Sequence, residues 1–263
     1  MNAPRDFVLA TTDPNGVATL TLNRPEKGNA YDLGMLDRLM AEITRLGILP
    51  EIRALVLRGA GKHFCVGGDL TEPLVHVGGG PGDKQITMPQ VCLALEACPK
   101  PTIALVHGAC VGASFALVAC CDILLASEDA FFLVPELRRG FGVGPFIPFF
   151  VRALGARQAR RFLITGEQFS AQEALVMGMA HRLYARGTAD QALADLLRNV
   201  LQSAPGAIAA TKRELSELAD LTPTREQIDE LQAGFRRLFE ADEGVEGRAA
   251  FRDKRLPSWA PKP

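Results

Sequence analysis

Two glycine-bearing segments of this chain could together bind a developing negative charge. In His63–Leu70 the double glycine Gly67-Gly68 forms a tight turn, so backbone N–H groups can face outward into a cleft. In His107–Phe115 the chain turns at glycine and enters an apolar helix, whose first amides, near Ala113, point out of the helix N-terminus. Two such N–H groups can form an oxyanion hole.

A third segment offers a candidate base. Glu136 follows Pro135 and the apolar run Phe131–Val134, and apolar surroundings raise the pKa of a carboxyl group. A base beside an oxyanion hole can remove a proton from the carbon next to a carbonyl group, because the hole stabilises the negative charge that develops on the carbonyl oxygen. Each segment alone also fits an ordinary turn or a solvated glutamate, so it is their combination that favours a catalytic site.

The sequence shows no motif for phosphate binding, metal binding, or serine or thiolate catalysis. The glycine-rich stretch Gly78–Gly82 lacks phosphate-loop spacing and is expected to be a mobile surface loop. Cysteines and histidines show no paired ligand spacing, so no metal site is predicted. Ser114 is not in a Gly-x-Ser-x-Gly elbow, which disfavours a serine hydrolase. Cys65 and Cys110 have no neighbouring base in the sequence, which disfavours thiolate catalysis.

The elements that must position these segments alternate along the chain. Phe7–Thr12 and Val17–Leu22 are predicted to form a hairpin, and Leu36–Leu46 has helical periodicity. Further short apolar strands are expected at Ala54–Leu57, Thr102–Val106, Ile123–Ala126 and Phe131–Val134, with a helix at Pro89–Ala97. From Phe146 onward the pattern is almost wholly helical, with a capping box at Ser170–Glu173. The sequence therefore predicts an α/β core followed by helices.

Composition restricts the classes of partner and location. The 263 residues carry 29 Lys+Arg against 30 Asp+Glu, a net charge of −1 that disfavours nucleic-acid binding. The six cysteines are expected to be reduced and mostly buried. Pro101–Cys121 has no charge, but its glycines and polar residues favour strand, loop and core helix over a membrane span. Met1–Ala10 shows no signal peptide, so a cytoplasmic protein without membrane partners is expected.

Taken together, the motifs resemble the enoyl-CoA hydratase/isomerase family, also called the crotonase family, from about Phe7 to Trp259. The matching motifs are Asn23-Arg-Pro-Glu-Lys-Gly-Asn-Ala30, Phe64-Cys-Val-Gly-Gly-Asp-Leu70, His107-Gly108 with Cys121-Asp-Ile123, Pro135-Glu136 with Gly140, and Phe251-Arg-Asp-Lys-Arg-Leu-Pro257. The resemblance implies a spiral of ββα units over residues 1–200 and a helical oligomerisation region over 201–263. It also implies a homotrimer or a dimer of trimers.

The resemblance implies acyl-CoA thioester substrates and names three catalytic positions. Gly68 and Ala113 match the two N–H donors that hold the thioester carbonyl, and Glu136 matches a family glutamate. Hydratases of the family carry a second glutamate, which maps here onto Ala116. One carboxylate favours carrying a proton between carbons. Double-bond isomerisation is therefore preferred, with hydration or a non-catalytic acyl-CoA-binding subunit as alternatives.

The same resemblance assigns coenzyme A contacts. These are Arg24, Lys27, Cys65, Phe251 and Lys254, of which the last two often act from a neighbouring subunit in the family. No cofactor is expected beyond the coenzyme A of the substrate itself. Arg138 and Arg139 could stabilise ionised Glu136 and weaken it as a base, although at least one of them is expected on the solvated surface.

Overall fold

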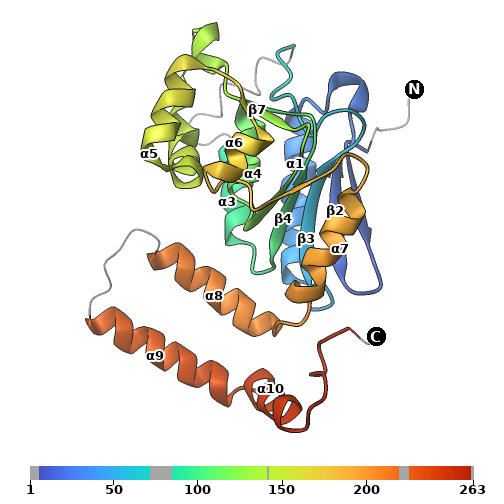
Figure 1. Ribbon diagram of the computed structural model, residues 1–263, viewed down its shortest axis with the longest axis vertical. Coiled ribbons are helices and arrows are strands. Elements are labelled where there is room, and N and C mark those ends of the chain that lie inside the picture. Colours follow the sequence, from blue (N-terminus) through green and yellow to red (C-terminus); the bar gives the residue numbers. More distant parts are fainter. Residues whose placement is uncertain (1–5, 72–84, 141, 219–224, 262–263) are drawn as a thin grey trace.

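The computed structural model describes residues 6–71, 85–140, 142–218 and 225–261. The expected glycine-rich surface loop at Gly78–Gly82 lies outside the described residues. Two sheets and the helices packed on them form the main body, and three C-terminal helices lie below it in Figure 1.

The larger sheet has six strands in the order β1-β2-β3-β4-β6-β9. Its strands are β1 (Val8–Thr12), β2 (Val17–Leu22), β3 (Ala54–Gly59), β4 (Thr102–Val106), β6 (Ile123–Ser127) and β9 (Arg182–Tyr184). The first pair is antiparallel, with Val8 opposite Leu22, which confirms the predicted hairpin. All later pairs are parallel, and β4 is buried along its whole length. Parallel strands buried on both faces explain the uninterrupted apolar runs in the sequence.

A smaller three-stranded sheet has the order β5-β7-β8. It consists of β5 (Ala109–Val111), β7 (Phe131–Leu133) and β8 (Phe169–Ser170). The sequence reading did not predict β5, β8 or β9. Each of these strands is only two or three residues long, too short to show an alternating pattern.

Helices cover the sheets, as Figure 1 shows. They are α1 (Leu33–Ile48), α3 (Met88–Ala97), α4 (Ala113–Ala119), α5 (Ile147–Thr165), α6 (Ala171–Val176) and α7 (Ala189–Val200). The uncharged segment Pro101–Cys121 is strand, loop and buried helix, as expected. An aromatic cluster fixes α4 against α5, with the rings of Phe115 and Phe150 stacked at 4.9 Å.

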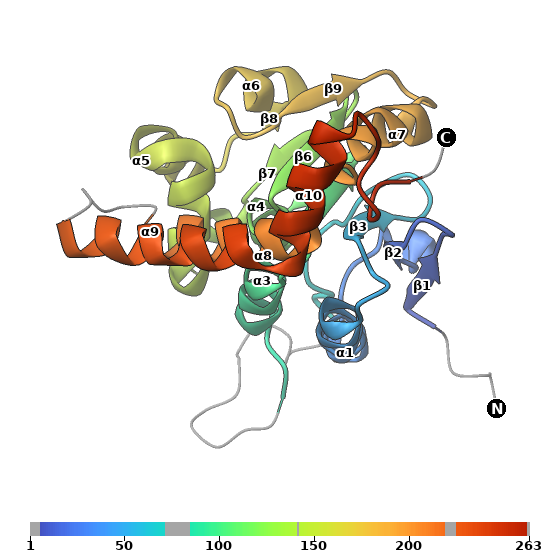
Figure 2. The same cartoon turned by 90° about the horizontal axis from the view of Figure 1, so that it is seen from below.

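The C-terminal helices are α8 (Pro205–Leu218), α9 (Arg225–Glu240) and α10 (Asp242–Arg252). Figure 2 shows α9 and α10 at an angle to each other beneath the sheets. Several contacts tie this part to the body; Lys212 of α8, for example, pairs with Asp122 at 2.6 Å and donates to the carbonyl of Lys100 at 2.8 Å.

Candidate active site

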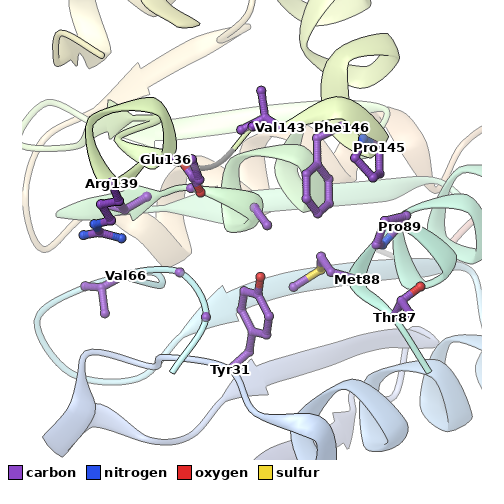
Figure 3. A pocket seen from close by; sticks show the side chains of 16 residues that line it. Tyr31, Val66, Thr87, Met88, Pro89, Glu136, Arg139, Val143, Pro145 and Phe146 are labelled. Carbon is purple, nitrogen blue, oxygen red and sulfur yellow. The ribbon is translucent and has the colours of Figure 1, made fainter. Parts of the chain in front are cut away.

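One cavity brings together the three residues that the sequence singled out for catalysis. Gly68, Ala113 and Glu136 all line it, although they lie on three separate segments (Figure 3). Its volume is about 220 Å³. The other lining residues are Tyr31, Val66, Gly67, Thr87, Met88, Pro89, Val111, Gly112, Arg139, Gly142, Val143, Pro145 and Phe146. Most of these are apolar, as is typical of a pocket for a small molecule.

Backbone pairing on either side of Gly68 fixes its amide at the cavity. The Tyr31 N–H donates to the carbonyl of Gly67 at 3.0 Å, and the Asp69 N–H donates to the carbonyl of Tyr31 at 2.8 Å. The Gly68 N–H itself donates no hydrogen bond within the described part of the chain. It is therefore free to bind an oxygen in the cavity.

The second amide belongs to Ala113, the first residue of α4. Gly112 precedes it with φ +64° and donates its own N–H to the carbonyl of Leu133 at 2.7 Å. The first N–H groups of a helix have no acceptor within it, and the helix dipole makes this end favourable for negative charge. The Ala113 N–H has no acceptor among the described residues, so both amides are available.

Ser114 holds the two amide-bearing segments together, a role that the sequence reading did not find. Its buried hydroxyl accepts the Val111 N–H at 2.9 Å and lies 3.0 Å from the carbonyl of Cys65. Val111 also donates to Cys65, at 3.0 Å. The loop that contains Gly68 is thus bonded to the start of α4. A serine directly after a glycine-alanine turn matches no distinctive motif, so its role could not be predicted from the sequence.

Glu136 begins the short 3-10 helix Glu136–Arg139. Its Oε2 is buried without a hydrogen-bond partner among the described residues. Burial raises the pKa of this carboxyl group, and a hydrogen bond from its own backbone N–H and the nearby charge of Arg139 act in the opposite direction. A carboxylate with a raised pKa is a stronger base than a solvated one.

The two arginines after Glu136 differ in their surroundings. Arg138 donates to the carbonyl of Thr165 at 3.1 Å, away from the cavity. Arg139 is exposed but lines the cavity beside Glu136 (Figure 3). Of these two arginines, only Arg139 places its charge at the cavity.

The position of the missing second glutamate is also defined. Ala116 lies on α4, is completely buried and does not line the cavity. Among the sixteen described residues around the cavity, Glu136 is the only carboxylate. The described site has one acid/base group of this type.

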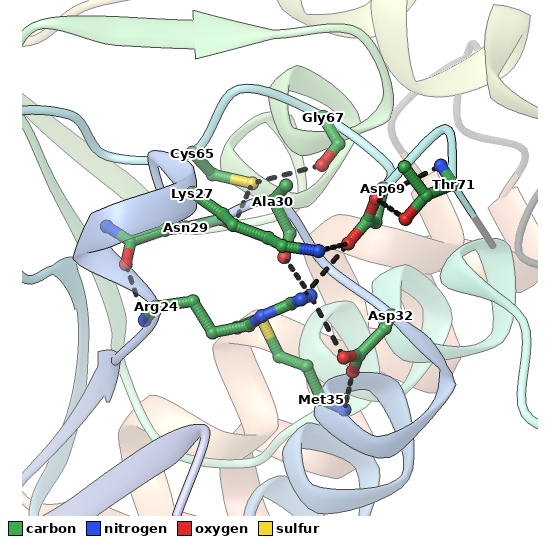
Figure 4. A network of polar contacts seen from close by, with 10 residues as sticks. All are labelled: Arg24, Lys27, Asn29, Ala30, Asp32, Met35, Cys65, Gly67, Asp69 and Thr71. Carbon is green, nitrogen blue, oxygen red and sulfur yellow. Dashed lines mark hydrogen bonds and ion pairs between the residues drawn. The ribbon is translucent and has the colours of Figure 1, made fainter. Parts of the chain in front are cut away.

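Arg24 and Lys27 converge on one carboxylate near the cavity (Figure 4). Arg24 contacts Asp69 at 3.0 Å and Asp32 at 2.9 Å, and Lys27 contacts Asp69 at 2.8 Å. These hydrogen bonds, led by that of Lys27, hold the pKa of Asp69 far below its usual range. Arg24 is 6% exposed, whereas nearly half of the Lys27 side chain is open to solvent. The buried network braces the residue directly after Gly68.

The other three residues expected to contact coenzyme A lie in different surroundings. Cys65 is buried, and its thiol donates to the carbonyl of Asn29 at 3.0 Å. Burial raises the pKa of this thiol to about 11. Phe251 is 88% exposed near the end of α10, and Lys254 follows that helix with φ +53°. Neither Phe251 nor Lys254 lines the cavity of its own chain.

The described residues show neither a metal-binding cluster nor a membrane-spanning helix. They contain no group of three or more histidine, cysteine, aspartate or glutamate side chains placed to hold a metal ion. None of the described helices is both long and apolar enough to cross a membrane.

Comparison with known proteins gives one consistent result. The family model for enoyl-CoA hydratase/isomerase matches residues 12–262. Mevalonyl-coenzyme A hydratase of Aspergillus fumigatus is 31% identical over 93% of this chain and 92% of its own. A peroxisomal Δ(3,5)-Δ(2,4)-dienoyl-CoA isomerase of Arabidopsis thaliana is 28% identical over 97% of this chain and 96% of its own.

Solved structures agree with this match. Pseudomonas aeruginosa AtuE superposes with a TM-score of 0.90 at 34% identity, covering 97% of this chain and all of its own. An enoyl-CoA hydratase/isomerase from Marinobacter aquaeolei also reaches 0.90, at 30% identity over 98% of this chain and all of its own. The predicted fold class is confirmed by these superpositions.

Proposed function

Since this chain belongs to the enoyl-CoA hydratase/isomerase (crotonase) family and is an acyl-CoA enzyme of that family, we propose that it moves a double bond along the acyl chain. The observation that carries this proposal is the single carboxylate, Glu136, in a cavity that also presents two free backbone amides. The substrate class is a 3-enoyl-CoA thioester, and the product is the conjugated 2-enoyl-CoA.

In the proposed mechanism, the thioester oxygen accepts hydrogen bonds from the N–H groups of Gly68 and Ala113. Glu136 removes a proton from C2, and the electron pair moves into the thioester to give a dienolate whose oxygen is held by these amides. Glu136 then returns the proton to C4, and the double bond moves between C2 and C3. Each amide matters because the charge develops on the oxygen, and losing one donor typically costs about 10²- to 10³-fold in kcat.

The surroundings of Glu136 suit a group that carries one proton both ways. Its Oε2 has no hydrogen-bond partner among the described residues, and burial, the largest influence on its pKa, favours the protonated form that exists between the two transfers. Ala116, fully buried on α4, offers no second acid or base to position a water molecule. Both features favour isomerisation.

Hydration is a second candidate, favoured by the similarity to a mevalonyl-coenzyme A hydratase. In that reaction Glu136 would act on a water molecule that adds to C3 of a 2-enoyl-CoA. The cavity would then have to hold this water with one carboxylate instead of two. A non-catalytic acyl-CoA-binding subunit is the third alternative, and it predicts thioester binding without turnover.

The deciding experiment offers 3-enoyl-CoA and 2-enoyl-CoA esters of four to ten carbons in H₂¹⁸O and follows the products by mass spectrometry. Isomerisation predicts conjugated products without ¹⁸O, and a substrate deuterated at C2 should carry part of its label to C4 because one base moves it. Incorporation of ¹⁸O at C3 as the main reaction would establish hydration instead.

The same assay on Glu136→Gln tests the assigned base. The amide keeps the shape of the side chain but cannot accept the proton, so turnover should fall about 10²- to 10⁴-fold. Binding of a saturated acyl-CoA should remain nearly unchanged. Wild-type turnover in this variant would rule out Glu136 as the base.

Coenzyme A itself is proposed to follow the family pattern, with Lys27 near its phosphates and Phe251 and Lys254 reaching it from a neighbouring subunit of a trimer or hexamer. The half-exposed Lys27 ammonium and the nearly fully exposed Phe251 support this arrangement. Arg24 and Cys65 are proposed to act through the loop they brace, since both are buried and bonded within it.

A further inference from the structure

A histidine side chain completes the backbone pairing between the two segments that carry the proposed oxyanion amides. Cys65 and Cys110 pair as in a parallel bridge, and the Cys65 N–H donates to the carbonyl of Ala109 at 3.0 Å. Regular continuation of this parallel ladder would direct the Ala109 N–H to the carbonyl of His63. The Ala109 N–H donates instead to the imidazole Nδ1 of His63, at 3.1 Å. The imidazole therefore takes the place of a backbone acceptor.

The carbonyl of His63 is occupied by another donor. It accepts the side-chain amide of Asn29 at 2.7 Å, and the same amide donates to the carbonyls of Ala60 at 2.8 Å and Phe64 at 3.1 Å. Asn29 is completely buried, and Ala109 is 3% exposed. Without the imidazole, the Ala109 N–H would be a buried donor left unpaired, which is unfavourable.

The bond between His63 and Ala109 lies where the two amide-bearing segments begin. Ala109 is the first residue of β5, which leads through Gly112 into Ala113 at the start of α4. His63 begins the segment that leads to Gly68. Because β5 is only three residues long, each of its bonds contributes to its placement. The His63 bond is thus one of those that set the spacing between the two amides.

Only a neutral imidazole can accept this bond, because Nδ1 must then carry no proton. Burial and the charges of Lys62 and His107 lower the pKa of His63 below its usual value of about 6.5, whereas the charge of Asp129 acts in the opposite direction. The ring is therefore neutral at pH 7. In acid, protonation places a hydrogen on Nδ1 that faces the Ala109 N–H, and the bond is lost.

We infer that His63 is a positioning residue for the oxyanion hole, and that protonation of its imidazole in acid loosens the pairing between the segments of Gly68 and Ala113 and lowers turnover. This inference rests on the proposed function, which assigns these two amides to the thioester oxygen. The effect is separate from that of Glu136, whose protonation removes the base. Acid should therefore reduce activity in two ways.

Hydrogen exchange of the Ala109 amide tests the bond without any substrate. Its protection, relative to an unstructured peptide at the same pH, should fall about 5- to 10-fold from pH 7.5 to pH 5, as expected for the loss of one hydrogen bond. His63→Asn keeps an acceptor near the position of Nδ1 and does not titrate, so protection in this variant should stay constant. Constant protection in the wild type would overturn the inference.

The kinetic test uses the enoyl-CoA ester that the wild type converts fastest. Dividing kcat/KM of the wild type by that of His63→Asn cancels the titration of Glu136, which both proteins share. This ratio should fall about 5- to 10-fold from pH 7.5 to pH 5. His181→Asn is the matched control, because His181 also accepts a backbone N–H through Nδ1, from Leu124 at 3.0 Å, but does not line the cavity. The ratio of wild type to His181→Asn should not change with pH.

A further variant, His63→Leu, has no acceptor at any pH, so its kcat/KM should lie below that of His63→Asn by the same factor throughout. If exchange at Ala109 changed with pH while the ratio of wild type to His63→Asn stayed constant, the bond would be structural only, and the positioning role would be wrong. Absence of turnover with every ester would overturn the proposed function, and with it the effect of His63 on turnover. Exchange at Ala109 would still show whether the bond depends on pH.

Discussion

The carboxylate of Glu136 occupies the space that a side chain at Gly112 would need. A Cβ atom on Gly112 would overlap Oε1 of Glu136, and its φ of +64° lies in the left-handed region that favours glycine. Gly112 directly precedes Ala113, whose amide is proposed to bind the thioester oxygen. One glycine thus sets both the start of α4 and the room for the base.

Gly112→Ala should therefore inactivate the enzyme while leaving it folded. The methyl group displaces the carboxylate and strains the turn before α4, so turnover should fall at least about 100-fold. Left-handed strain alone costs about 1–2 kcal/mol. Gly178→Ala is the control, because Gly178 has φ +77° and open space around it, far from the cavity. Equal activity losses in the two variants would refute a steric effect on Glu136.

The charge of Arg139 should be visible in the pH dependence of turnover. Activity needs ionised Glu136, so it falls as pH decreases through the pKa of that group. Burial places this pKa above the ordinary value for glutamate, and Arg139 lowers it again. Arg139→Gln removes the charge that lowers the pKa of Glu136. The acid limb of the kcat/KM profile should therefore shift to higher pH.

Arg138→Gln serves as the control for this shift, because Arg138 bonds to the carbonyl of Thr165 instead of facing the cavity. Its acid limb should coincide with that of the wild type. High salt should reproduce part of the Arg139 effect, since Arg139 is exposed and its charge is screened. If the acid limb of Arg139→Gln lay at lower pH than that of the wild type, the inferred effect of Arg139 on the pKa of Glu136 would be wrong.

The Asp69 network should stabilise both the fold and the oxyanion loop. Asp69 is 6% exposed and accepts from Arg24, Lys27 and Thr71. Removing one partner of a buried ion pair typically costs 3–5 kcal/mol, and Asp32 still neutralises Arg24 in Asp69→Asn. We expect a loss of about 3 kcal/mol at pH 7, measured by urea unfolding, together with a lower kcat.

The pH dependence of this loss has a defined sign. Because the pKa of Asp69 is depressed in the folded protein, its stabilisation is present above the unfolded-state pKa of about 3.9 and disappears as pH falls below it. The free energies of unfolding of the wild type and of Asp69→Asn should therefore converge at acidic pH. Asp190→Asn, at an exposed pair with Arg58, should cost less than about 1 kcal/mol and provides the comparison.

Local pattern in the sequence was sufficient for the main elements and for the three residues around the cavity. The hairpin, the buried strands, α1, α3 and the Ser170 capping box follow from periodicity and turn residues that act over a few positions. Tight turns and a carboxylate after an apolar strand pointed to the segments of Gly68, Ala113 and Glu136, and the family resemblance assigned their roles; the cavity brings the three together, and their catalytic roles stay predictions.

Long-range pairing could not be predicted in the same way. Tyr31 reaches the cavity only because its backbone bonds to the residues around Gly68, which lies 37 positions later in the chain. Arg24 looked like a surface cation for a phosphate, yet the fold buries it between Asp32 and Asp69. Such partners depend on tertiary packing, which one sequence does not reveal.

The C-terminal helices and the segment after them expose several large apolar side chains. The exposed fractions are 64% for Phe235, 47% for Phe239, 52% for Val245, 88% for Phe251 and 54% for Leu256. The side chains of Ile228 and Leu231, expected on the same surface, lie outside the described part.

Exposed phenylalanines gathered on one part of a chain favour a subunit interface. We expect light scattering at micromolar concentration to give three or six times the 28.3 kDa chain mass. Phe251→Asp should shift this toward monomer and weaken acyl-CoA binding together, because Phe251 is proposed to reach a neighbour's coenzyme A. Ile48→Asp, at a 78% exposed position at the end of α1, should change neither property. A monomeric wild type would refute the shared interface and would leave Phe251 without a route to any coenzyme A site but its own.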